Sequence, residues 1–218
     1  MRWMICTLVT LFALSTLAQM AIAEGWTVSV QGGTSVPTGD FADKEKADAQ
    51  TGWAVGGSVD YLWNEMWAFG VDGSWNQNTQ GAEGQVVDLG GGSTRSLDEA
   101  KFKTWQVGAH AKYFFPTSAQ MPVKWYGLAG AGVYAFNEDV SETLTSGGTS
   151  SSTSSQLTDK RAGMKLGLGG TWWANPQVGV NVGADYNVAF LDKDVSPFSS
   201  LQYLGAYAGV TYSIPKAK

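Results

Sequence analysis

Residues 53–75, WAVGGSVDYLWNEMWAFGVDGSW, decide the fold of this chain. Apolar side chains or glycine occupy every second position from 53 to 63 and again from 67 to 75, and small or polar residues fill most positions between them. Successive side chains of a β-strand point to opposite faces, so each half predicts a strand with one apolar and one polar face. Only residues 64–66 separate the halves, which predicts an antiparallel hairpin.

The same alternation recurs along the chain, and no helical period competes with it. We predict eight strands, at residues 26–36, 52–63, 67–77, 102–115, 123–136, 161–173, 177–190 and 201–214. Short connections are expected at 64–66, 116–122 and 174–176, and long polar ones at 37–51, 78–101, 137–160 and 191–200. An even number of antiparallel strands, with short turns at one end and long loops at the other, is typical of transmembrane β-barrels.

Composition supports a lipid-facing surface. Only 15% of the 218 residues are charged, 12% are aromatic and 28 are glycine; typical soluble domains have about 25% charged residues. The formal net charge of −5 excludes the basic footprint of a general nucleic-acid-binding protein.

The first 23 residues match a secretory signal peptide. Arg2 precedes an apolar run, and the small-residue site Ala21-Ile22-Ala23 lies before Glu24. We expect cleavage there, which leaves residues 24–218 as one barrel domain; an N-terminal membrane anchor is the alternative. Cys6, the only cysteine, lies in the signal segment, so no disulfide or thiol chemistry is expected in the mature chain.

Aromatic residues gather at both ends of the predicted strands and predict two interfacial girdles. The girdle residues are Trp53, Trp63, Trp67, Trp75, Trp105, Phe115 and Trp172, with Phe136 and Tyr203 added at the long-loop ends. Ten residues of tilted strand, as from 53 to 63, span about 25 Å, the height of the apolar band of an outer membrane.

From residue 24 to 218 the chain resembles the small outer-membrane barrels of the OmpA, OmpX and OmpW kind. The glycine-rich run 126–134 and the closing run 208–214 carry this resemblance together with the alternating strands. The resemblance implies an all-β fold, a closed antiparallel eight-stranded transmembrane barrel with short periplasmic turns and long extracellular loops. It also implies location in the outer membrane and, as partners, membrane lipids, lipopolysaccharide and the outer-membrane assembly machinery.

Strand parity turns several polar residues into the barrel lumen. These are Asp60, Asp72, His110, Lys112, Lys165 and Asp185. Pairing Trp172 with Val178 across the turn at Asn175 predicts that Lys165 lies opposite Asp185, as an ion pair between neighbouring strands.

Nothing in the sequence predicts an enzyme, a cofactor or a metal centre. Related lipid A deacylases use a His-x-Ser pair, but here the tripeptide is His110-Ala111-Lys112, so we assign no catalytic residue. Acidic residues of the loops at 40–48 and 138–142 are read as solvated side chains rather than calcium ligands. Residues 143–158 are rich in serine, threonine and glycine, and we expect them to remain unordered.

We therefore expect a non-enzymatic envelope scaffold that displays extracellular loops to a partner the sequence does not identify. The alternatives are a narrow channel or small-ligand conduit, then a lipid A-modifying enzyme, and then a soluble ligand-binding barrel.

Overall fold

The computed structural model describes residues 25–81, 85–116, 123–146, 148–190 and 200–214. The predicted signal peptide and most of the connection at 191–200 lie outside these residues. The strands are β1 (Trp26–Thr38), β2 (Gly52–Leu62), β3 (Trp67–Thr79), β4 (Val86–Gly90), β5 (Ser93–Phe114), β6 (Val123–Ser146), β7 (Thr149–Trp173), β8 (Val178–Phe190) and β9 (Ser200–Ser213), with one short 3-10 turn, η1 (Gly39–Phe41). None of the described residues form a helix long and apolar enough to cross a membrane.

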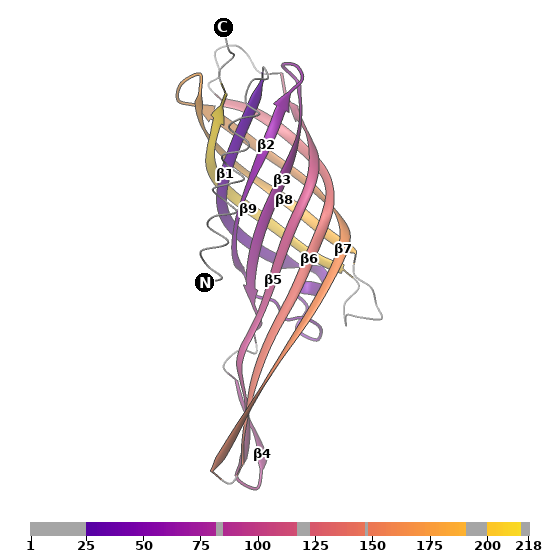
Figure 1. Ribbon diagram of the computed structural model, residues 1–218, viewed down its shortest axis with the longest axis vertical. Helices are drawn as coiled ribbons and strands as arrows, with labels where there is room; N and C mark the ends of the chain where they lie inside the picture. The colour runs from indigo at the N-terminus through magenta and orange to yellow at the C-terminus, as the bar shows by residue number, and fades with distance from the viewer. Residues whose placement is uncertain (1–24, 82–84, 117–122, 147, 191–199, 215–218) are drawn as a thin grey trace, which may run out of the picture.

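Eight of the strands close into an antiparallel barrel, as predicted (Figure 1). They follow the order β3-β2-β1-β9-β8-β7-β6-β5, and pairing of β3 with β5 closes the ring. A path of paired residues that starts at Trp67 and passes once around the ring returns to β3 at Gln77. This ten-residue stagger over eight strands corresponds to a strand tilt of about 40°.

Two asparagines shape short turns at one end of the barrel, here called the turn end. Asn64 Oδ1 accepts hydrogen bonds from the backbone N–H groups of Met66 and Trp67, each at 2.8 Å. Asn175 does the same for Gln177 and Val178, at 2.9 and 2.8 Å. The asparagine side chain thereby replaces backbone pairing where the chain reverses, which is the reason the strands end there.

At the opposite, loop end, two predicted loops turn out to be strands. β5, β6 and β7 continue beyond the barrel wall as a narrow sheet, joined by β4 at its tip (Figure 1). The prediction that residues 143–158 are unordered is therefore wrong. Cross-strand hydrogen bonds, such as the one of 2.8 Å between Thr143 and Ser152, order this polar stretch in place of apolar burial.

The outward surface of the barrel is apolar from one end of the wall to the other. Large side chains stand exposed on it, among them Val71 (57%), Val107 (67%) and Leu168 (64%). β6 turns Tyr126 and Tyr134 inward, which leaves mostly small residues on its outward side. Such a surface is stable only when it faces another apolar phase, because a monomer in water rarely exposes so large an apolar patch.

Candidate functional site

A chain of alternating charges crosses the centre of the lumen. It runs from Lys112 to Asp60, His110, Asp72 and Lys165, which come from β2, β3, β5 and β7. Lys112 Nζ donates to Asp60 Oδ2 at 2.7 Å, and Lys165 Nζ donates to Asp72 Oδ2. The chain ties together strands that are not neighbours in the sheet, so it braces the barrel from within.

His110 is the central link, and both of its ring nitrogens face carboxylates. Nε2 lies 2.5 Å from Asp60 Oδ1 and Nδ1 lies 2.7 Å from Asp72 Oδ1. Ionised carboxylates only accept hydrogen bonds, so this geometry is complementary to the doubly protonated imidazolium. With Asp185 included, three carboxylates then face three cations in the lumen.

Glycines beside these residues leave the space that the cluster occupies. A methyl group on Gly70 of β3 would lie 2.5 Å from Asp60 Oδ1 and 2.5 Å from the carbonyl oxygen of Val59. A methyl group on Gly130 of β6 would lie 3.0 Å from Cβ of His110. The inward positions flanking His110 therefore have to be glycine for the imidazole to reach its two partners.

The predicted pairing of Lys165 with Asp185 is wrong. Strand β8 is displaced by two residues from the predicted register, so Trp172 pairs with Val180 and Lys165 with Asn187. Backbone pairing continues through Trp173 and Ala174 on one side of the turn, and the turn that Asn175 caps ends only at Val178. The connection between the two strands is therefore longer than the three residues predicted. Asp185 instead accepts a hydrogen bond of 2.8 Å from Asn187 Nδ2.

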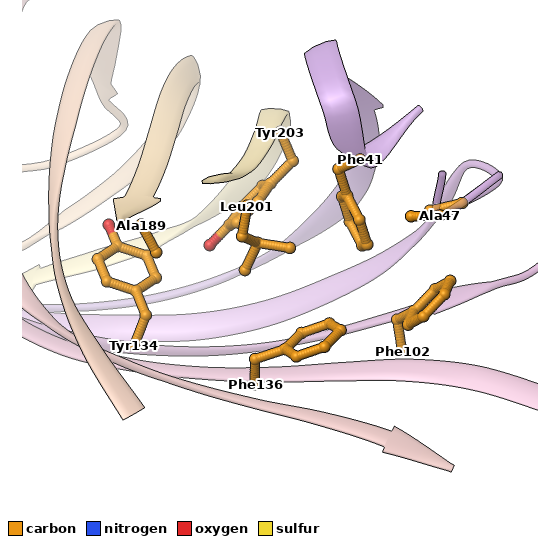
Figure 2. Close-up of a cluster of buried hydrophobic side chains, with 9 residues drawn as sticks. Phe41, Ala47, Phe102, Tyr134, Phe136, Ala189, Leu201 and Tyr203 are labelled. Carbon is orange, nitrogen blue, oxygen red and sulfur yellow. The ribbon is translucent and has the colours of Figure 1, made fainter. Parts of the chain in front are cut away.

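An apolar plug fills the lumen at the loop end (Figure 2). Its members are Phe41, Ala47, Ala49, Phe102, Tyr134, Phe136, Ala189, Leu201 and Tyr203. Phe41, carried by the connection between β1 and β2, packs edge-on against Phe102 and Phe136, with ring centroids 5.3 and 6.2 Å apart. This connection thus folds back into the mouth of the barrel.

The described residues line two small cavities in the lumen, one on each side of the charged cluster. The cavity toward the loop end, of about 40 Å³, is lined by Asp72, Lys165 and Asp185. The cavity toward the turn end, of about 50 Å³, is lined by Asp60, Lys112 and Asn181. Each has room for no more than a few water molecules.

Residues 4–213 match the family described as outer membrane protein beta-barrel domain. The chain belongs to this outer-membrane β-barrel family. The crystal structure of Neisserial surface protein A is similar, with a TM-score of 0.55 and 19% identity over 87% of this chain and 97% of that chain. The outer membrane protein OprG from Pseudomonas aeruginosa has a TM-score of 0.46 and 13% identity over 90% of this chain and 99% of that one. No curated protein matches the sequence.

Family membership places this barrel in the outer membrane, and its aromatic residues lie at two levels of the outward wall. The exposed members at these levels are Trp53, Trp63, Trp67, Trp105, Phe115 and Trp172. Trp75 is half-buried because it lies between Trp53 and Trp105, with ring centroids 4.4 and 6.0 Å away. The girdle assignment of Phe136 and Tyr203 is wrong: both point inward and belong to the plug, with exposed fractions of 1% and 4%.

The predicted lumen residues of this outer-membrane barrel come together, but the plug was missed. Phe41 stood in the stretch 37–51, which was predicted as a polar loop, whereas Phe102 was the first residue of a predicted strand. No sequence period marks a loop side chain that folds back into a barrel. Among the described residues, no group of three or more histidine, cysteine, aspartate or glutamate side chains is placed to hold a metal ion. The serine of a His-x-Ser pair is also missing on the strand of His110, where Lys112 occupies its position.

Proposed function

We propose that this protein is a non-enzymatic scaffold of the outer membrane that displays its protruding sheet outside the cell for surface interactions. The observation that carries the proposal is the extension of β5, β6 and β7 beyond the barrel as an ordered sheet. A rigid projection with its base in a braced barrel holds a binding surface away from the membrane. This arrangement suits the display of a binding surface better than the transport of a solute through the barrel.

One edge of the protruding sheet is open. From residue 149 to 162, β7 pairs with β6 on one side and with no strand among the described residues on the other, because pairing with β8 begins at Gly163. Residues 149–158 contain no charged residue and no proline, and these are two of the devices that protect an edge from pairing. An extended segment of a partner protein can add to such an edge through backbone hydrogen bonds.

The side chains that fill the lumen favour a scaffold rather than a conduit. The apolar plug closes it at the loop end, and the charged cluster crosses it at the centre. Moving a solute through would require both the displacement of Phe41 and its neighbours and the breaking of three or more ion pairs that are largely withdrawn from water.

Planar-bilayer recording of the refolded protein tests this closure. We expect no conductance above the baseline from the native chain. The double variant Phe41→Ala/Lys165→Ala, which weakens both barriers, serves as the positive control and should show brief openings. Steady ohmic conductance from the native chain would contradict a closed scaffold.

Shortening the protruding sheet tests whether this sheet carries the proposed surface interactions. Replacing residues 140–155 with an Asn-Gly turn keeps Asp139 and Gln156 as the last pair of the ladder, so the barrel is left intact. Cells that express the shortened chain should lose adherence to a panel of immobilised extracellular-matrix proteins, while the shortened barrel still folds and shifts on an unheated gel. Equal adherence of both forms to the whole panel would argue against display by this sheet.

A narrow channel is the second candidate, favoured by one observation. The two cavities lie on the two sides of the charged cluster, so rearrangement of its ion pairs would connect them. A lipid A-modifying activity gains no support from the site, because carboxylates occupy both ring nitrogens of His110.

A further inference from the structure

The edge strand of the protruding sheet, β7, has a long row of backbone groups without a strand partner in the described part of the chain. From residue 149 to 162 it pairs with β6 alone, and its pairing with β8 begins at Gly163. At about 3.3 Å per residue, this free edge is roughly 45 Å long. It extends away from the loop end of the barrel (Figure 1), so it is accessible to a partner from outside.

Side chains along the free edge carry hydroxyl groups rather than charges. Residues 149–155 are all serine or threonine, and all are exposed. Hydroxyls of this strand already pair with those of β6, Ser152 with Thr143 at 2.8 Å and Ser150 with Thr145 at 2.9 Å. Because a hydroxyl both donates and accepts, one such row is complementary to a second identical row. The edge therefore fits a copy of itself.

Symmetry selects an antiparallel pair for two identical edges. A two-fold axis perpendicular to the sheet brings each edge N–H of one strand opposite an edge C=O of the other. A two-fold axis along the strands would instead place N–H opposite N–H, so a symmetric parallel pair cannot form its hydrogen bonds. In the antiparallel pair the two barrels lie at opposite ends of the joined sheets. Such a pair fits two facing membranes and does not fit a single membrane.

The length of the free edge allows this pairing without a clash between the barrels. With Thr153 opposite its own copy, residues 149–157 of the two chains overlap and Ser152 of each lies opposite Ser154 of the other. Residues 158–162 then separate the overlap from Gly163, where the barrel wall begins. These residues span about 16 Å, which leaves room for the end of the other copy's sheet.

The opposite edge of the protruding sheet is less suited to pairing with itself. It is formed by β4, which is only five residues long and has Asp88 at its centre. An antiparallel pair of two such strands would bring two Asp88 carboxylates close together, and like charges on facing strands are destabilising. The β7 edge is longer and carries no charge from residue 149 to 158.

We propose that the free β7 edge pairs with the same edge of a second copy in the membrane of a facing cell, so that the protein joins cells to each other. This inference rests on the proposed function, because the protruding sheet has to be displayed outside the cell. Backbone hydrogen bonds along residues 149–157 hold the two copies together. A single pair is weak because the polar edge buries little apolar surface. Many pairs between two cells make the contact stable.

Aggregation of mixed, differently labelled cells tests the proposal. Cells that express the native full chain carry a green label, and otherwise identical cells without the protein carry a red label. We expect aggregates that contain green cells and exclude red ones. Equal inclusion of red cells would overturn the proposal, because the partner would then be another molecule of the cell surface.

Charges placed on the edge test the pairing itself. Ser152→Lys/Ser154→Lys puts like charges opposite each other in the joined sheets, and aggregation of these cells should fall about tenfold. Thr94→Lys/Ser96→Lys is the matched control, because it adds the same charges to the same face of the sheet on β5, two strands from the edge. Cells with the control variant should aggregate as native cells do. Mobility on an unheated gel shows that each barrel is folded.

Opposite charges should restore the contact. Cells with Ser152→Glu/Ser154→Glu should not aggregate alone, but they should aggregate when mixed with cells that carry Ser152→Lys/Ser154→Lys. Failure of this mixture to aggregate, or native aggregation of either charged variant alone, would overturn the proposal.

Adherence to matrix proteins separates this inference from the proposed function. If shortening the sheet abolishes adherence while native cells do not aggregate, the self-pairing is wrong and the proposed function stands. If native cells aggregate but the shortened chain adheres to the whole panel as the native chain does, the result counts against the proposed function alone.

Discussion

Lys165 of β7 forms its ion pair with Asp72 of β3, on the other side of the lumen, although Asp185 lies on the neighbouring strand β8. β5 and β6 separate the two partner strands in the sheet, so this contact spans the interior of the barrel. Both side chains are 9% exposed, which means that each charge depends on the other for its solvation.

Removing either member of this pair should destabilise the barrel strongly. Lys165→Met and Asp72→Asn each leave an uncompensated charge in the lumen, and we expect a loss of about 3–5 kcal/mol for each where water does not enter. The double variant should cost less than the sum, as measured by urea unfolding in lipid vesicles. A coupling energy of Lys165 with Asp185 that exceeds its coupling with Asp72 would show that the pair is assigned to the wrong partner.

A methyl group on Gly70 should disturb the centre of the cluster. Because the added atom would lie 2.5 Å from Asp60 Oδ1, Gly70→Ala should lower the free energy of unfolding by about 1–3 kcal/mol. Gly73→Ala, on the outward side of the same strand, meets its nearest atom only at 3.5 Å and serves as the control. Equal stability of the two variants in the same unfolding assay would contradict the crowding described here.

Arginine at position 71 should be costly because Val71 lies midway between Trp67 and Trp75 on the lipid-facing wall. We expect Val71→Arg to destabilise the folded barrel by about 2–4 kcal/mol, the usual cost of a cation near the centre of a bilayer. Val87→Arg, on the exposed strand β4 beyond the barrel, is a matched substitution and should have little effect. Refolding yield and unfolding in lipid vesicles measure both, and equal yields would place position 71 outside the apolar band.

Thiol labelling of intact cells tests which end of the barrel faces outward. An impermeant maleimide should label Ser151→Cys in the protruding sheet and not Glu65→Cys in a short turn, because the long loops are expected outside the cell. Lysed cells should label at both positions, which shows that both cysteines are reactive. Labelling at position 65 alone in intact cells would reverse the proposed orientation.

Strand positions and faces were predictable because they depend on local alternation. Every outward residue from Trp53 to Trp63 had to be apolar or small to face lipid, and its neighbour had to fit the lumen, so a period of two is visible without any tertiary contact. The strands β5, β6 and β7 were predicted too short because the alternation that marks a strand is missing from their outer parts. Beyond the membrane neither face meets lipid, so the period disappears although backbone pairing continues.

The sequence by itself therefore determined the closed eight-stranded barrel, its lipid-facing wall and the set of charged residues that enter the lumen. Only the tertiary structure decided which of those charged residues form ion pairs and which residues fill the lumen at the loop end. A two-residue difference in register keeps every side chain on its predicted face, so alternation cannot detect it, yet it moves Asp185 away from the position opposite Lys165. The partners of Lys165 and Phe41 depend on distances across the closed barrel, and these distances exist only once all eight strands have paired.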